Sequence, residues 1–151
     1  MQPHGNAKRS MRKAMIYLGL SLVLFVGGCR DSEQLNWEQS KATHEMRYID
    51  EKLDIPIIDA YKAGSRPRNM SELKAVPDVD TDRVRPIEDW GLYVDVSSLE
   101  FEIVEDSEEI SRIKYNAKVD IPEDPKIKQL EMIANYYHDS RPVTFDYTWK
   151  R

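Results

Sequence analysis

The apolar positions of residues 35–151 change period along the chain, and each change marks a new element of secondary structure. In the first part, apolar residues recur at steps of seven, four, three and four: Leu35, Ala42, Met46, Ile49 and Leu53. Such steps keep side chains on one face of a helix. The spacing predicts an N-terminal helix from about residue 32 to 54. We expect Pro56 to break or kink it, because proline has no backbone N–H to donate.

Short helices are predicted after this first helix. A short helical piece is expected to stop at Gly64, since glycine adopts the left-handed conformation found at helix ends. Asn69, followed by Glu72 three residues later, is typical of a capped helix start and predicts a second piece over residues 70–75. Residues 77–89 show no period and are predicted to form a loop.

Alternation of apolar and polar residues predicts strands in the middle of the chain. The ranges 92–96, 99–105 and 110–119 show this period of two. The last two are expected to form an antiparallel hairpin. The predicted register puts apolar pairs inside and opposite charges outside, and a slip of one residue would mix both faces. In this register Phe101 faces Tyr115, Ile103 faces Ile113, and Glu102 faces Lys114.

The C-terminal part is predicted to contain a second substantial helix and a last strand. Asp124 and Pro125 are typical of a helix start, as N-cap and first helical residue. Residues 125–138 carry a helical stripe: Ile127, Leu130, Ile133, Ala134 and Tyr137. The alternation of residues 143–149 predicts the final strand. Helices with a small antiparallel sheet give a single α+β domain over residues 35–151.

The first 28 residues differ in kind from the rest. They contain no acidic residue, and four cations precede an apolar run: Lys8, Arg9, Arg12 and Lys13. The run, Ala14–Val26, has 13 positions, whereas a membrane-spanning helix needs about 20 apolar residues. The pattern predicts that residues 1–28 are a secretory signal peptide.

The end of this leader carries a more specific motif. Residues 25–29 read Phe-Val-Gly-Gly-Cys, which resembles the lipobox of bacterial lipoproteins. The resemblance implies cleavage before Cys29 and covalent lipid on that residue, with residues 29–34 as the lipidated N-terminus and a short linker. Gly27 departs from the family, where alanine, serine or threonine is commoner. Two alternatives stay open: an ordinary leader followed by an unrelated cysteine, and a translation start at Met11.

Composition agrees with export and lipid attachment. Cys29 is the only cysteine, so the exported domain has no internal disulfide. Removal of the four leader cations leaves 18 Lys and Arg against 27 Asp and Glu, a formal charge of −9. This acidic balance argues against nucleic acid as a partner. We expect lipid, and not a basic patch, to attach the protein to the membrane. By analogy with lipoproteins of double-membraned bacteria, Arg30 implies the outer membrane, facing the periplasm.

A second resemblance lies in the middle of the chain. It rests on three motifs: Tyr61-x-x-Gly64-x-x-Pro67, Ser71-Glu72-Leu73 and Asp89-Trp90-Gly91-Leu92-Tyr93. They are similar to the globular part of type II secretion pseudopilins, and imply a helix, a short helix and then a small antiparallel sheet. The resemblance does not extend to filament assembly, because pseudopilins retain their apolar segment as the filament-forming helix. The calcium loop common in that family is also not found in the sequence.

Few residues are candidates for chemistry. Asp78, Asp80, Asp82 and Asp89 have the spacing of a calcium loop. Arg83 occupies the position where such a loop turns at glycine, so a solvated acidic loop is the preferred interpretation. The two histidines of the exported part belong to no cluster with zinc-ligand spacing. No phosphate-binding glycine loop or nucleophile motif is found, so we predict no catalytic residue and no cofactor apart from the lipid.

Binding is the role that remains. Arg66 and Arg68, in a cationic stretch of an acidic chain, and Trp149 near the C-terminus are candidates for contacts with a partner. The arginines are also explained as countercharges, and strand alternation favours the core for Trp149. We expect a lipid-anchored accessory that binds another envelope protein without catalysis. The alternative is a periplasm-facing enzyme or enzyme inhibitor acting on envelope substrates.

Overall fold

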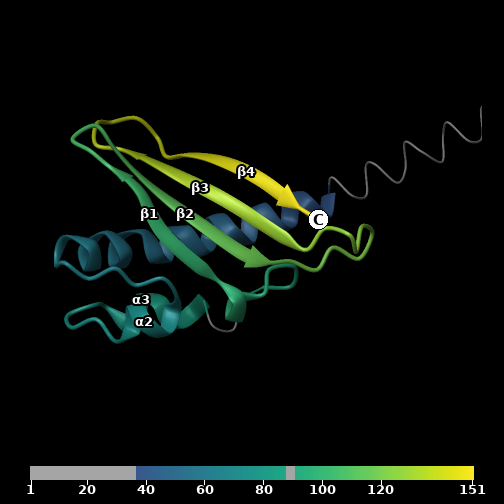
Figure 1. Ribbon diagram of the computed structural model, residues 1–151. Coiled ribbons are helices and arrows are strands. Elements are labelled where there is room, and N and C mark those ends of the chain that lie inside the picture. The colour runs from purple at the N-terminus through teal and green to yellow at the C-terminus, as the bar shows by residue number, and fades with distance from the viewer. Residues whose placement is uncertain (1–36, 88–90) are drawn as a thin grey trace, which may run out of the picture. The chain divides into compact units, whose positions relative to one another are not determined.

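The computed structural model describes residues 37–87 and 91–151 (Figure 1). Within them, Glu38–Arg151 form one compact unit. The predicted signal peptide and Cys29 lie outside the described residues. No helix in the described ranges combines the length and the apolar character that crossing a membrane requires.

A long helix covers residues 37–62. It stops as predicted at Gly64, whose φ is +86°. The N–H of Gly64 donates to the carbonyl of Tyr61 at 3.0 Å, and the N–H of Ser65 donates to that of Ala60 at 2.9 Å. This pair of bonds is the glycine-based closure typical of helix C-termini.

The predicted break of the helix at Pro56 is wrong, because the helix continues through this residue. Leu53 and Ile57 are buried on either side of it and belong to one apolar stripe. Burial of such side chains contributes about 1.5–3 kcal/mol each, which offsets much of the roughly 3 kcal/mol cost of proline in a helix. The predicted first residues of the helix, 32–36, lie outside the described part of the chain.

Short helical segments follow the long helix. In α2 (Met70–Lys74), the Asn69 side chain accepts the N–H of Glu72 at 2.9 Å, which confirms the predicted cap. The predicted loop over residues 77–89 is confirmed over 77–80. It is wrong over 81–87, because α3 (Thr81–Val84) and η1 (Arg85–Ile87) lie there. Both segments end in a buried apolar residue, and burial of these two side chains favours their helical turns.

The sheet is an antiparallel meander in the order β1-β2-β3-β4. The hairpin is confirmed with its register, including Phe101 opposite Tyr115 and Ile103 opposite Ile113. The register then shifts at a bulge between Ile103 and Glu105. The predicted final strand agrees with β4 to within one residue. The strands are β1 (Glu100–Asp106), β2 (Ile110–Lys118), β3 (Gln129–Tyr137) and β4 (Thr144–Lys150).

The predicted C-terminal helix over residues 125–138 is wrong, because most of this range forms β3. Leu130, Met132 and Ala134 are fully buried and alternate with less buried residues, so the period of two prevails over the helical stripe. Asp124 and Pro125 form a turn, in which the N–H of Ile127 donates to the carbonyl of Asp124 at 3.0 Å. Asp-Pro suits the first two positions of a β-turn as well as a helix start.

The predicted strand over residues 92–96 is also wrong. Val94 makes a single bridge with Val119, and η2 (Val96–Ser98) begins two residues later. The Asp95 side chain accepts the N–H of Ser97 at 3.0 Å and so favours the helical turn. The backbone N–H groups of residues 92–94 bond to a helix side chain, described below, and not to a neighbouring strand.

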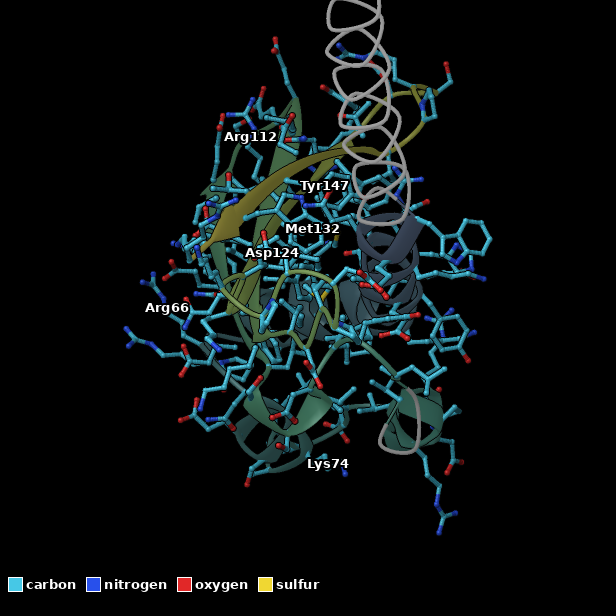
Figure 2. The ribbon with its side chains drawn as sticks, turned by 90° about the vertical axis from the view of Figure 1, so that its right-hand side faces the viewer. Arg66, Lys74, Arg112, Asp124, Met132 and Tyr147 are labelled. Atoms are coloured by element: carbon cyan, nitrogen blue, oxygen red, sulfur yellow. The ribbon has the colours of Figure 1, made fainter. Side chains whose placement is uncertain are left out.

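The long helix lies across one face of the sheet (Figure 1), and the core is between them. Met132 lies in this interior, whereas Arg66 extends at the periphery (Figure 2). The helix contributes a continuous stripe: Ala42, Met46, Ile49, Leu53, Ile57 and Ala60. The facing residues of the central strands are equally buried: Ile113, Tyr115, Ala117, Leu130, Met132 and Ala134. The α+β class is thereby confirmed.

Two isoleucines of the helix test this packing. Ile49 is 0% exposed and Ile55 is 45% exposed. We predict that Ile49→Ala lowers the free energy of unfolding by about 2–5 kcal/mol, because it leaves a cavity under the helix. Ile55→Ala is the matched control and should cost less than about 1 kcal/mol. Urea unfolding followed by circular dichroism measures both, and equal losses would contradict the assigned helix face.

Candidate functional site

A buried glutamate of the long helix holds a loop that follows it by nearly fifty residues in sequence. The carboxylate of Glu45, which is 8% exposed, accepts three consecutive backbone N–H groups. These belong to Leu92 at 2.8 Å, Tyr93 at 3.1 Å and Val94 at 2.8 Å. Bonds to an ionised acceptor contribute about 1.5–3 kcal/mol each, so this clamp fixes the loop firmly. We call residues 91–94 the clamped loop.

The clamped loop depends on a glycine and displays a leucine. Gly91 has φ +131°, and a Cβ there would lie 2.5 Å from the carbonyl oxygen of Val94. Only glycine fits this position without displacing the backbone. The next side chain, Leu92, is 89% exposed. The loop thus presents a large apolar side chain on a backbone that the helix holds in place.

A second acid of the helix is buried in the core. Asp50 is 3% exposed and accepts a hydrogen bond from the hydroxyl of Tyr136 on β3. Burial is the main cause that raises the pKa of Asp50 to about 7. Burial likewise raises the pKa of Tyr136 and Tyr115. The Tyr115 hydroxyl is buried beside this carboxyl, and its interaction with Asp50 opposes part of the effect of burial on the pKa of Asp50.

Asp50 belongs to the interior between the helix and the sheet. Its carboxyl lies beside the aromatic side chains of Tyr115 on β2 and Tyr136 on β3. Its neighbour Asp54 also has a raised pKa, caused first by burial and opposed by the charge of Arg83. The acids on this face of the helix therefore belong to the packing of the fold.

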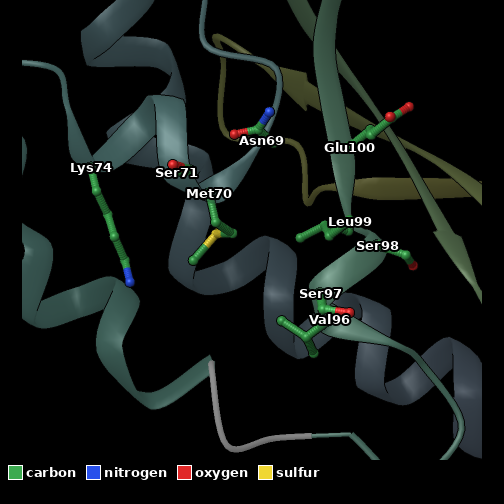
Figure 3. Close-up of a pocket in the computed structure, with 9 residues that line it drawn as sticks. All are labelled: Asn69, Met70, Ser71, Lys74, Val96, Ser97, Ser98, Leu99 and Glu100. Carbon is green, nitrogen blue, oxygen red and sulfur yellow. The ribbon is translucent and has the colours of Figure 1, made fainter.

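An open hollow lies between α2 and the segment that leads into β1 (Figure 3). Its volume is about 620 Å³. Ser97 and Ser98 both donate from their hydroxyls to Asp95, and Ser98 also accepts the N–H of Lys118. Glu100 is the only acid among the described residues that line the hollow, so no carboxyl pair converges there. The described lining residues are Asn69, Met70, Ser71, Lys74, Val96, Ser97, Ser98, Leu99 and Glu100.

Among the described residues, no cluster of three or more histidine, cysteine or acidic side chains could hold a metal ion. The residues considered for calcium therefore form no such cluster where the structure describes them. Asp78 has a positive φ of 65°, and Asp80 accepts the N–H of Asp82 at 3.1 Å. That bond lies at the start of α3 and is of the kind that aspartate side chains make with backbone nearby. Asp89 lies outside the described residues.

The predicted binding residues occupy two settings, one for the two arginines and one for Trp149. The guanidinium of Arg66 lies 5.3 Å from the centre of the Tyr61 ring. The charge of Arg68 contributes to lowering the pKa of Glu102, after the larger effect of Lys114. Trp149 is half-buried on β4 opposite Leu130, on the helix-facing side of the sheet. Arg66 and Arg68 line one small hollow together with Tyr61 and Glu102. The structure therefore brings the two arginines together, and Trp149 lies on a different element, β4.

Sequence reasoning missed Glu45 and Asp50 because it followed the apolar residues of the helix and passed over the acids beside them. Glu45 lies three residues after Ala42 and four before Ile49, and Asp50 lies four after Met46. Spacings of three and four put these acids on the buried stripe. A buried acidic side chain needs a hydrogen-bonding or ionic partner. The position of these acids on the apolar stripe was therefore a signal in the sequence that each has such a partner.

The clamp is tested by removing its carboxylate. We predict that Glu45→Ala speeds hydrogen exchange at the amides of Leu92, Tyr93 and Val94 at least tenfold, since a factor of ten corresponds to about 1.4 kcal/mol. Glu51→Ala, an exposed glutamate of the same helix, is the control and should leave these amides unchanged. Equal exchange in both variants would show that the loop keeps its shape without Glu45. The readout is exchange followed by mass spectrometry or NMR.

The buried acid gives a pH dependence of defined sign. Because the folded pKa of Asp50 is about 7 and its ordinary value is 3.8, the folded state holds its proton more tightly than the unfolded chain. Stability should therefore fall as pH rises from about 4 to 7, by about 1.4 kcal/mol per unit of pKa difference. We predict that Asp50→Asn removes most of this fall and is more stable than wild type at pH 8.

Urea unfolding at pH 4.5, 6 and 8 measures the effect. Asp59→Asn, on an exposed residue of the same helix, is the control and should keep the wild-type slope. Tyr115, Tyr136, Tyr147, Glu51 and Asp54 are the titratable groups near Asp50, and of these Asp54 also contributes to the slope. An Asp50→Asn variant with an unchanged slope would contradict the assignment.

Comparison with known proteins adds no relative. No protein-family model matches the chain. The curated proteins and the solved structures gave no match either. The resemblances to bacterial lipoproteins and to pseudopilins therefore stay predictions, carried by the residues that define them.

Proposed function

We propose that this protein is a lipid-anchored accessory of the cell envelope, which binds another envelope protein and catalyses no reaction. The leader and its lipobox-like end at Cys29 support export and anchoring. Two or three acyl chains hold a protein to a bilayer stably, whereas one holds it marginally. Arg30 after the cysteine supports the outer membrane, with the domain facing the periplasm.

The observation that carries the binding role is Leu92 on the clamped loop. An exposed leucine gains about 1.5–3 kcal/mol when a partner buries it. The Glu45 carboxylate already holds the backbone of Leu92, Tyr93 and Val94, so binding does not have to order this loop. Preorganisation of this kind lowers the entropic cost of association. A partner with an apolar socket fits this surface.

The alternative of an enzyme has less support. Catalytic acids with a perturbed pKa are expected where an open cavity lets a substrate reach them. Here the carboxyl with the most strongly raised pKa, Asp50, is buried between helix and sheet. The buried carboxylates of Glu38 and Glu45 accept backbone N–H groups, from Glu123 in the first case and from the clamped loop in the second. Their bonding supports a role in holding loops to the helix.

Cross-linking in living cells, followed by mass spectrometry, tests the proposal. We predict that the wild-type chain captures one envelope protein, and that Cys29→Ser loses it because the chain is no longer held at the membrane. Leu92→Ser should reduce capture at least tenfold without changing membrane attachment. Val143→Ser, which changes another exposed apolar residue, is the matched control and should capture normally.

Two outcomes would overturn parts of this proposal separately. If Leu92→Ser captures as much partner as wild type, the clamped loop is not the binding surface. If folded, membrane-bound wild type captures no specific protein, the accessory role fails, and a small molecule or a wall component becomes the better candidate ligand.

A further inference from the structure

The two edge strands of the sheet, β1 and β4, differ in the features that protect an edge strand from pairing with another chain. At the β1 edge, the N–H of Phe101 donates to the carbonyl of Arg68 at 2.8 Å, and Asn69 bridges to Glu100. A bulge interrupts the register after Ile103. Four of the seven β1 residues are acidic. Covering segments, bulges and charge are the devices that keep an edge strand from pairing with another chain.

The opposite edge, β4, lacks these devices. All seven of its residues pair with β3 in one unbroken register. It contains no proline and only one acid and one base, Asp146 and Lys150. Among the described residues, backbone hydrogen bonds to β4 come only from β3 and from Lys128 beside it. In the part of the chain that the structure describes, the other side of β4 is therefore open to a further strand.

The side chains of β4 are complementary to those of β4 in a second copy of the chain. Along the strand, aromatic residues face the helix side and polar residues face the opposite side. If a second copy of β4 lies antiparallel across a two-fold axis at Thr148, Asp146 faces Lys150 of the copy and Tyr147 faces Trp149. Thr148 faces its own equivalent. Opposite charges, aromatic pairs and threonine pairs are the combinations that stabilise neighbouring strands.

We propose that two copies of this chain associate through their β4 edges in this register, which joins two four-stranded sheets into one. The surface goes beyond the partner binding assigned to Leu92 and involves none of the clamped loop. It does not depend on the lipid anchor. A two-fold interface of this kind is isologous, so one strand supplies both halves of the contact.

Other registers fit less well. A shift that moves the axis to Tyr147 puts Asp146 opposite Thr148 and Lys150 opposite Thr144, so both charge pairs are lost. A relative slip of one residue sets aromatic side chains against polar ones on both faces. The helix does not need to move for the proposed register. The Arg47 guanidinium lies over the rings of Phe145 and Tyr147, at 5.0 and 5.5 Å, on the face of the sheet and not beyond its edge.

Cysteine cross-linking of the full chain in membranes tests the register. In Thr148→Cys the two thiols lie across the axis, on Cβ atoms about 4.5–5.5 Å apart. In Thr144→Cys they lie eight residue steps apart, about 27 Å. Both are exposed threonines on the same face of β4, so the second variant is the matched control. With a short bis-maleimide, we expect Thr148→Cys to form a dimer band at least tenfold stronger than Thr144→Cys.

The wild-type chain controls for Cys29, its only cysteine. A dimer equally strong in both threonine variants, or absent from both, would overturn the proposal. So would a Thr148→Cys band that contains a different protein in place of a second copy.

Charge reversal gives an independent readout in the Thr148→Cys chain. Asp146→Lys places like charges opposite each other and should reduce the dimer band at least fivefold. Addition of Lys150→Asp restores opposite charges and should restore the band. Asp146 also accepts from Asn135 at 3.0 Å, and Lys150 pairs with Glu131 at 2.7 Å, so thermal unfolding of each variant must be compared. If the double variant folds but does not regain the dimer, the charge pairing is wrong.

Discussion

The structure depends on one constraint, which is that a four-stranded sheet with one apolar face must have that face covered. The outer face is polar and carries cross-strand ion pairs, such as Lys114 with Glu102 at 2.7 Å. The inner face carries large apolar residues, among them Tyr115, Leu130 and Met132. A single long helix covers it, and this is why the helix continues through Pro56 and closes only at Gly64. Burial on this scale outweighs the local preference of one residue.

The same constraint explains the buried acids of the helix. A helix that covers a sheet buries a face wider than its apolar stripe, so polar residues at the border are drawn in with it. Glu38 and Glu45 compensate for their burial by accepting backbone N–H groups of distant segments. Asp50 compensates for its burial by accepting a hydrogen bond from Tyr136, and its raised pKa means that it keeps its proton to a higher pH. Polar groups at the helix border thus fix where the connecting loops lie.

The segments predicted correctly from the sequence are those whose pattern of apolar and polar residues fits only one type of secondary structure. The hairpin of β1 and β2 pairs apolar with apolar residues and Glu102 with Lys114, and a slip would spoil both faces. Residues 129–137 fit a helical stripe and an alternation equally well, and only the need for a third strand beside β2 decides between them. The clamped loop was missed as a site because its shape comes from Glu45, which lies far away in the sequence. Signals that depend on such a remote partner are absent from any short window.

The clamp between Glu45 and the loop also has a consequence for the order of folding. Contacts between residues this far apart in sequence form only after the intervening chain has closed, so they belong to the late stages of assembly. The helix and the sheet have to be docked before the carboxylate can meet the three amides. The conformation in which Leu92 is exposed is therefore held only in a chain whose helix and loop have already come together.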